Sequence, residues 1–272
     1  MTNSKPVIVI AAYGTGEPEA LRCLETLDGA FCNRFAGYEV RWALLVDWII
    51  KRLKKERKNN LWARGEPIKS LTGVYQELQE AGKTNVVVQG LLVHEGGISD
   101  GVYEMPTGSL RIEYGKSLLD AAGRNVDEVL RAVSPYFGGE NEVTILVGHG
   151  SGDDERANVP FRRMNEYLKQ HHPNAHMCMI HGSPSPDEVL PKIDSSRFRR
   201  VVFVPLMITA GEHVLHEVVA DSPKSWVSRL HLPYYVAPSF SEIPEVVEIY
   251  FKSIENALGR LKNDSRTILG GR

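Results

Sequence analysis

Three histidines lie just after apolar runs that are typical of buried strands. His149 follows the predicted strand 143–147, and His181 follows 176–180. His213 follows 201–208 after a short turn. Because the carboxyl ends of parallel strands meet at one edge of a sheet, we expect the three imidazoles to converge in one cleft. Imidazole binds divalent ions such as Co, Ni, Fe and Zn, and it takes up a proton near neutral pH. The pattern therefore predicts a metal site that also accepts protons.

Each histidine also has an ordinary structural explanation. His149, between two glycines, suits a turn; His181 suits a loop; and His213 suits a helix start. The coincidence of all three at one predicted sheet edge favours the metal site over three separate explanations. His216, one helical turn after His213, is interpreted as a surface residue, with a fourth-ligand role left open. Cys178 lies within a predicted strand and is assigned to the core.

The elements that would position these side chains alternate between strands and helices. The four clearest strand patterns are apolar and β-branched, as in parallel sheets buried on both faces, and three weaker ones accompany them. The expected strands are Val7–Ala12, Val86–Val93, Val143–Val147 and Val201–Ile208, with Glu39–Leu44, His176–Ile180 and Tyr234–Ala237. The expected helices are Asp47–Arg57, 66–81, 116–135, 158–171, 186–194, 214–230 and 244–261. The alternation predicts an α/β fold with parallel sheets.

A weak internal repeat divides the chain. The segment from Val7 to Gly16 resembles the segment from Val143 to Gly152, and 86–93 resembles 201–208 in the same order. We therefore expect two similar α/β lobes, residues 1–138 and 139–272, with the histidine site in the second. A further option is that the C-terminal helix packs back on the first lobe.

Composition excludes several classes of protein. The chain has 272 residues, 42% of them apolar and 24% charged, with a formal net charge of -2. These values fit a soluble globular protein; they do not fit a disordered chain or a bulk nucleic-acid binder. No stretch reaches the roughly 18 apolar residues of a membrane span. Three cysteines without a paired spacing predict reduced thiols and a cytoplasmic protein, with homo-oligomerisation left open.

Familiar catalytic motifs are incomplete. Gly14-Thr15-Gly16 starts like a dinucleotide fingerprint, but Glu19 occupies the third glycine position. Ser151 lacks the flanking glycines of a nucleophile elbow, so a hydrolase of the α/β type is disfavoured. His213 and His216 do not form a zinc-protease motif.

Several longer segments resemble one known family. They include Tyr13-Gly14-Thr15, Tyr38–Arg41, Gly148-His149-Gly150 and, most specifically, Val204–His213 followed by Asp221–Trp226. Across residues 5 to 260 the sequence is similar to the CbiK-type anaerobic sirohydrochlorin cobaltochelatases of the class II chelatase superfamily. The resemblance implies ATP-independent insertion of a divalent metal into a tetrapyrrole such as sirohydrochlorin, in cobalamin or related biosynthesis. Co²⁺ is the expected ion, with Ni²⁺ and Fe²⁺ as alternatives, and no organic cofactor is implied.

The resemblance also assigns site residues. The family's two metal-site histidines match His149 and His213, which we expect to be catalytic, and one of them would take up a proton. The family's third ligand is a glutamate at the position of His181, so the chain departs from the family there. The expected metal ligands are His149, His181 and His213.

The tetrapyrrole would be the small-molecule partner, without nucleic acid or membrane. Its carboxylates need donors, and glycine-rich turns at 14–16 and 150–152 suit anions. The residues expected to bind substrate are Thr15, Ser151, Glu95 and Glu212. A non-catalytic tetrapyrrole, haem or metal carrier on the same fold remains the alternative, because histidine also ligates haem iron.

Overall fold

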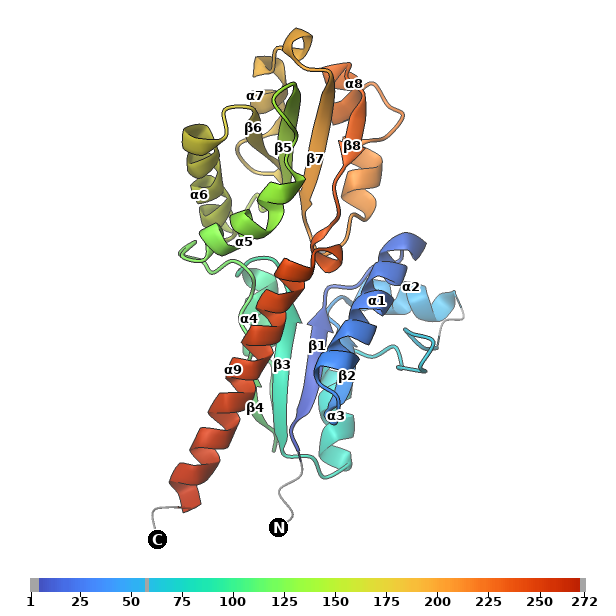
Figure 1. The fold of residues 1–272 in the computed structure, drawn as a ribbon. Helices are drawn as coiled ribbons and strands as arrows, with labels where there is room; N and C mark the ends of the chain where they lie inside the picture. Colours follow the sequence, from blue (N-terminus) through green and yellow to red (C-terminus); the bar gives the residue numbers. More distant parts are fainter. Residues whose placement is uncertain (1–4, 57–58, 270–272) are drawn as a thin grey trace. The chain divides into compact units, whose positions relative to one another are not determined.

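Two four-stranded sheets, both entirely parallel, form the framework (Figure 1). We describe residues 5–56 and 59–269 from a computed structural model. The first sheet has the order β2-β1-β3-β4 and the second the order β6-β5-β7-β8, so both use the same topology. The strands are β1 (Val7–Ala12), β2 (Glu39–Leu44), β3 (Asn85–Leu91), β4 (Arg111–Tyr114), β5 (Glu142–Gly150), β6 (Ala175–His181), β7 (Arg200–Leu206) and β8 (Tyr234–Val236). The predicted α/β class and the two similar lobes are confirmed.

The central strands have the sequence that such a position demands. All six residues of β1 are buried, and four of them are Val or Ile. Parallel sheets are covered by helices on both faces, so a central strand such as β1 is apolar on both sides. The two sheets belong to two compact units, which are described separately below.

Unit 1 consists of residues up to Leu92, Gly97–Ser117 and the chain from Glu248 on. On one face of its sheet, Val74 and Tyr75 of α3 and Val102 of α4 pack against Val7 and Val9. On the other side, helices α1 and α9 meet where the ring of Phe31 lies 5.3 Å from that of Phe251. The helices are α1 (Pro18–Arg34), α2 (Asp47–Lys55), α3 (Leu71–Glu80), α4 (Gly97–Tyr103) and α9 (Pro244–Leu269).

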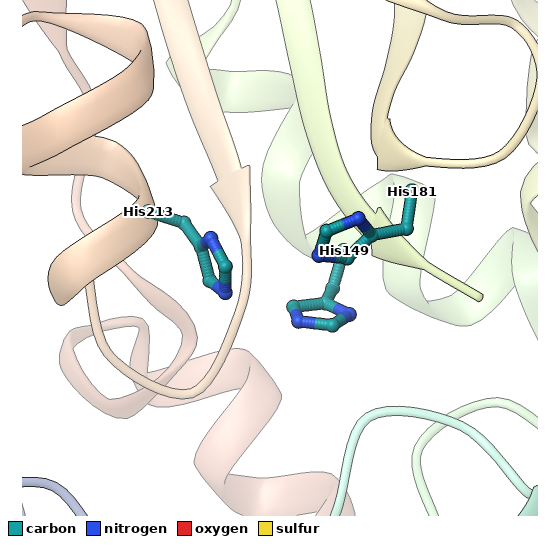
Figure 2. A group of neighbouring side chains, drawn as sticks. All are labelled: His149, His181 and His213. Atoms are coloured by element: carbon teal, nitrogen blue, oxygen red, sulfur yellow. The ribbon is translucent and has the colours of Figure 1, made fainter. Parts of the chain in front are cut away.

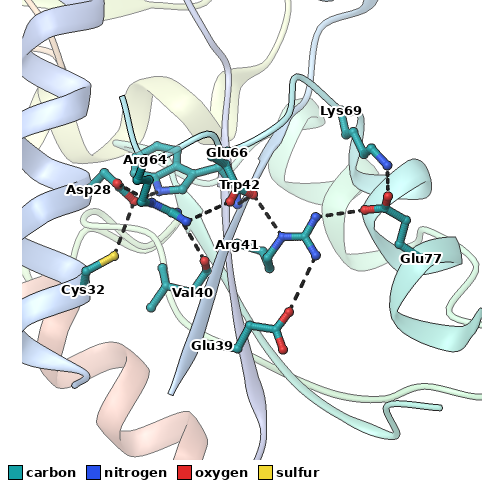
Figure 3. Close-up of polar contacts among 10 residues, drawn as sticks. All are labelled: Asp28, Cys32, Glu39, Val40, Arg41, Trp42, Arg64, Glu66, Lys69 and Glu77. Carbon is teal, nitrogen blue, oxygen red and sulfur yellow. Dashed lines mark hydrogen bonds and ion pairs between the residues drawn. The ribbon is translucent and has the colours of Figure 1, made fainter. Parts of the chain in front are cut away.

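A network of ion pairs holds the irregular segment after α2 onto this sheet (Figure 3). Arg64 lies 2.7 Å from Asp28 and 2.9 Å from Glu66, and both carboxylates are buried. Arg41 joins Glu66 at 3.1 Å, and Trp42 donates its indole N–H to Asp28 at 2.6 Å. Losing one partner of a buried pair leaves an uncompensated charge, which costs about 3–5 kcal/mol. The network therefore fixes residues 59–70 despite their lack of regular structure.

Unit 2 consists of Val93–Gly96 and Leu118–Val247. One face of its sheet packs against Val214 and Val218 of a π-helical turn, η4, and Trp226 of α8. On the other face, Phe161 of α6 lies beside Gly148 of β5. The helical segments are α5 (Val126–Val133), η1 (Ser134–Tyr136), α6 (Glu155–His171), α7 (Pro186–Val189), η2 (Leu190–Lys192), η3 (Ser195–Arg197), η4 (Val214–Val218), α8 (Trp226–Leu230) and η5 (Phe240–Glu242).

The division between the units differs from the one expected at residues 138 and 139. It falls between Ser117 and Leu118, because α5 packs against α6 and Asn125 is hydrogen-bonded to the carbonyl of Leu118. The C-terminal helix rejoins unit 1 from Glu248 on, the option that the sequence left open.

Several predicted helices are too long; for example, 186–194 is α-helical only over Pro186–Val189. The segment 66–81 is helical only from Leu71, where the Ser70 hydroxyl caps the helix. The segment 116–135 is helical only from Val126, after a turn in which Gly123 has φ of 64°. The segment 214–230 breaks into η4 and α8 around Pro223. No helix was predicted for 18–34, where α1 lies.

No disulfide joins Cys23, Cys32 or Cys178 in the described part of the chain. Cys178 is fully buried, and this burial raises its pKa to about 12, so it is a core thiol. Within the described part of the chain, no helix has the length and hydrophobicity to cross a membrane.

Candidate metal centre

Three imidazole rings from separate elements of unit 2 face one another (Figure 2). The ring of His149 lies 5.0 Å from that of His181 and 4.8 Å from that of His213, and the last two are 5.6 Å apart. One nitrogen from each ring lies within 4.8 Å of the others. In the described part of the chain, no other group of His, Cys, Asp and Glu side chains has this arrangement. The expected convergence at the sheet edge is therefore present.

The strand register places two of the rings. His149 is the penultimate residue of β5 and His181 is the last of β6, with Gly150 paired to His181. Gly150 has φ of 68°, and a Cβ built on it would lie 1.9 Å from the carbonyl oxygen of His181. Only glycine accommodates both the left-handed backbone and this close approach. Gly150 thus lets the ends of the two strands come close together.

The third ring comes from a different element. After β7 the chain turns through Met207–Gly211, and His213 directly precedes the π turn η4. The amide of Val219 donates to the carbonyl of Val214 at 3.0 Å, the five-residue spacing that defines a π turn. Val214 and Val218 bury one side of this turn in the core, and this packing fixes the backbone that carries His213.

Two of the rings have a partner at Nδ1. The Nδ1 of His149 lies 2.9 Å from the carbonyl oxygen of Gly150, and that of His213 lies 2.6 Å from Oε1 of Glu217. A carbonyl or carboxylate oxygen at Nδ1 fixes the hydrogen there and leaves the Nε2 lone pair free. In both rings the lone pair of Nε2 can therefore bind a metal ion.

The spacing of the nitrogens suits one ion after a small adjustment. Two nitrogens bound at about 2.1 Å are at most about 4.2 Å apart. The present separations of up to 4.8 Å exceed this limit slightly, so rotations of the rings would bring three nitrogens onto one ion. Three protein ligands leave coordination positions open, as in catalytic rather than structural metal sites.

Burial keeps His149 neutral. It lowers the pKa of His149, and the neighbouring rings of His213 and His181 lower it further. Burial also lowers the pKa of His94, a histidine whose ring packs edge-on against Phe161 and interacts with His149 electrostatically. A neutral imidazole is the form that binds a metal or accepts a proton. The environment of His149 thus favours both functions.

Ser151 and Glu95 are occupied by local hydrogen bonds. The Ser151 amide donates to Asn158, and its hydroxyl accepts from the amides of Asp153 and Asp154. Asp154 also caps α6, so the 150–152 turn carries acidic side chains where we expected an anion cradle. The carboxylate of Glu95 accepts from the amide of Ala121. These bonds use Ser151 and one oxygen of Glu95 as acceptors, and the Ser151 hydroxyl can still donate a hydrogen bond.

The carboxylate beside His213 was not foreseen. Glu212, which we expected to bind substrate, is exposed at the start of the helical turn, and Glu217 is the carboxylate that contacts His213. The spacing of four residues between His213 and Glu217 was the available signal. His216 lies outside the three-histidine group. Thr15 belongs to unit 1, where its hydroxyl accepts from the amide of Glu17.

Comparison with known proteins gives one family. The model of the cobalt chelatase family (CbiK) matches residues 6–259. A sirohydrochlorin cobaltochelatase, CbiKC, from Nitratidesulfovibrio vulgaris (Hildenborough) is 26% identical over 235 residues, which cover 84% of this chain and 80% of that relative.

Solved structures show the same fold. SirB from Bacillus subtilis with Fe³⁺ has a TM-score of 0.63 at 16% identity, covering 96% of this chain and 98% of SirB. CbiX, described as the terminal enzyme for biosynthesis of siroheme in denitrifying bacteria, has a TM-score of 0.56 at 16% identity, covering 93% and 99%. At these identities the likeness establishes the fold, that of the class II chelatases.

Proposed function

Because the chain belongs to the cobalt chelatase (CbiK) family, we propose that it inserts Co²⁺ into sirohydrochlorin. It is a metal chelatase, and metal insertion into a tetrapyrrole is the activity that its family membership supports. The choice of cobalt and of this macrocycle rests on the family description and on the name of the relative from N. vulgaris. The observation that carries the proposal is the convergence of His149, His181 and His213 on one point.

The reaction needs a site that holds a metal loosely and accepts protons. Two pyrrole N–H bonds break as the macrocycle binds M²⁺, so each turnover gives the metallated tetrapyrrole and two protons. Imidazole suits both tasks, because the same nitrogen lone pair binds the metal and then takes a proton after the metal has left. We propose that the three histidines hold the ion and that His149 or His213 accepts a proton.

The all-histidine set favours particular ions. Three neutral imidazoles bring no charge of their own, and nitrogen ligands suit Co²⁺, Ni²⁺, Fe²⁺ and Zn²⁺ better than hard ions such as Mg²⁺. This donor set supports Co²⁺, with Ni²⁺ and Fe²⁺ as the next candidates. A reducing compartment such as the cytoplasm fits the absence of a disulfide among the three cysteines of the described chain.

The test is an anaerobic assay of the purified protein with sirohydrochlorin and Co²⁺, Ni²⁺ or Fe²⁺, followed by absorption. We expect many turnovers with Co²⁺, and His149→Ala and His213→Ala should each lower the rate at least 100-fold, the scale of acid–base catalysis. His216→Ala, which alters a neighbouring exposed ring outside the group, is the matched control. Stoichiometric incorporation without turnover would instead indicate a carrier, and rates equal to those without protein would refute the proposal.

A further inference from the structure

Glu217 is the one carboxylate that contacts the three-histidine group among the described hydrogen bonds. Its Oε1 lies 2.6 Å from Nδ1 of His213, a short distance typical of a charge-assisted hydrogen bond. Both side chains remain partly open to solvent, 35% for His213 and 45% for Glu217. The contact is therefore not a buried structural pair, and it lies directly behind a proposed ligand.

The π turn explains why Glu217, and not His216, reaches the ring. Each π-helical hydrogen bond spans five residues, so the turn is wider than in an α-helix. A side chain four positions along then lies nearly above the first, while one three positions along is rotated away. Val214 and Val218, also four residues apart, face the core from the same turn. The backbone thus aligns Glu217 with His213 and leaves His216 exposed.

The contact determines which nitrogen of His213 is available to a metal ion. A carboxylate accepts a hydrogen bond but does not donate one, so Nδ1 of His213 must carry the hydrogen. Nε2 then keeps its lone pair, and a carboxylate at the opposite nitrogen makes an imidazole a stronger donor to a metal. Glu217 also adds a negative charge next to a donor set that has none. His149 has only a backbone carbonyl in the equivalent position.

We propose that Glu217 is a positioning residue that holds His213 in the Nδ1–H form and strengthens its bond to the metal. The inference rests on the proposed function only in taking His213 to be a metal ligand. The contact of Glu217 is with His213, so in this proposal it acts through that ring. Removal of such an outer partner typically lowers metal affinity 10- to 100-fold.

The test compares three variants without relying on turnover. Co²⁺ titrations should give the highest affinity for wild type, an intermediate one for Glu217→Gln and the lowest for Glu217→Ala: less than a 10-fold loss for Gln, and a 10- to 100-fold loss for Ala. Gln keeps an acceptor oxygen but no charge, so its partial rescue separates orientation from charge. Glu166→Ala is the matched control, because it removes an exposed carboxylate of unit 2 that pairs only with Lys169 among the described contacts.

A second readout reports the tautomer directly. Nitrogen-15 NMR of the metal-free protein should show His213 as the Nδ1–H form in wild type and as a mixture in Glu217→Ala, with unchanged thermal unfolding. An unchanged tautomer together with Co²⁺ affinity within twofold of wild type would overturn the proposal. Wild type that binds Co²⁺ but does not metallate sirohydrochlorin would refute the proposed function and leave this inference standing.

Discussion

The chemistry of the site depends on a neutral imidazole at His149, whose pKa is lowered by burial. Burial of a histidine on folding raises the free energy of its charged form, so its pKa falls. This applies to His149 and His94, and also to His176 in β6. Neutral rings can bind a metal, but in acid the cost of protonating a buried ring lowers the stability of the folded protein. Folding is therefore coupled to protonation at these positions.

His176 allows this coupling to be measured away from the three-histidine group. Burial lowers its pKa in the folded state, so as the pH falls through about 6.5 the unfolded chain binds the proton first. Stability is then full above about pH 6.5 and is lost as the pH falls towards the lowered value. One such group changes the unfolding free energy by at most about 1.4 kcal/mol per pH unit. In urea unfolding at pH 7.5, 6.5 and 5.5, the unfolding free energy of His176→Gln should decrease less with falling pH than that of wild type.

The control for this measurement is His171→Gln, a change at an exposed ring near the end of α6. Its pH dependence should match that of wild type. If the unfolding free energies of wild type and His176→Gln depend equally on pH, His176 is not a group whose protonation is coupled to unfolding.

At the scale of elements, the site depends on how β5 and β6 end. The left-handed Gly150 reverses the direction of the chain directly after His149, while its missing side chain makes room for the backbone of His181. Only glycine combines an unstrained left-handed backbone with the absence of a side chain. The ligand geometry is thus a property of a strand pair as much as of the histidines.

Gly150→Ala should therefore disrupt both strand ends. The left-handed conformation alone costs an L-residue roughly 1–2 kcal/mol. The new Cβ would also lie 1.9 Å from the carbonyl of His181, which forces the strands apart. We expect a loss of more than about 2 kcal/mol in unfolding free energy and at least a 10-fold loss in Co²⁺ affinity, measured by urea unfolding and titration.

Gly152→Ala serves as the matched change, since a Cβ there meets nothing within 4 Å. Gly152→Ala should change neither the unfolding free energy nor the Co²⁺ affinity appreciably. Co²⁺ affinity of Gly150→Ala equal to wild type would mean that the strand pairing does not set the spacing of the rings.

The sequence predicted the elements that position the histidines, because buried parallel strands have a strong signature. Runs such as Val7–Ala12 admit few other structures, and glycine or proline marks their ends. Once the strands are known, parallel order places His149 and His181 at one edge without any knowledge of contacts. That is why the three-histidine group could be derived from sequence while its distances could not.

Features that depend on distant partners were missed. Helix α1 buries Asp28 among Leu24, Leu27 and Phe31, which interrupts its apolar stripe; the partner Arg64 lies 36 residues away. Glu217 had a local signal, its spacing of four residues from His213, but the π turn that aligns the two side chains could not be derived from that spacing. Local patterns could not supply Arg64 as the partner of Asp28, because that contact depends on packing decided elsewhere in the chain.

For the whole molecule, near-zero net charge limits how a polyanionic tetrapyrrole is attracted. The formal charge is -2, and many basic groups are already paired, as in the Arg64 network. A global positive field is absent, so attraction must come from local donors. Charge in unit 1 instead contributes to stability, since it fixes the segment that follows α2.

The chain returns to unit 1 at Glu248 after completing unit 2. Removing this last segment therefore tests whether the two units fold independently. From Glu248 on, α9 buries five side chains in unit 1: Tyr250, Ile254, Ala257, Leu258 and Leu261. Each large apolar side chain contributes roughly 1.5–3 kcal/mol when buried, against a typical total stability of about 5–15 kcal/mol. A chain ending at Val247 should therefore lose the fold of unit 1.

Unit 2 should survive this truncation, because its core and all three histidines lie within Val93–Gly96 and Leu118–Val247. Hydrogen exchange should show β1 and β3 unprotected, with β5 and β7 still protected and Co²⁺ still bound. A chain ending at Asn263 keeps the five side chains and is the control, with both sheets protected. Simultaneous loss of protection in both sheets of the shorter chain would contradict this, because it would mean that the two cores unfold as one cooperative unit.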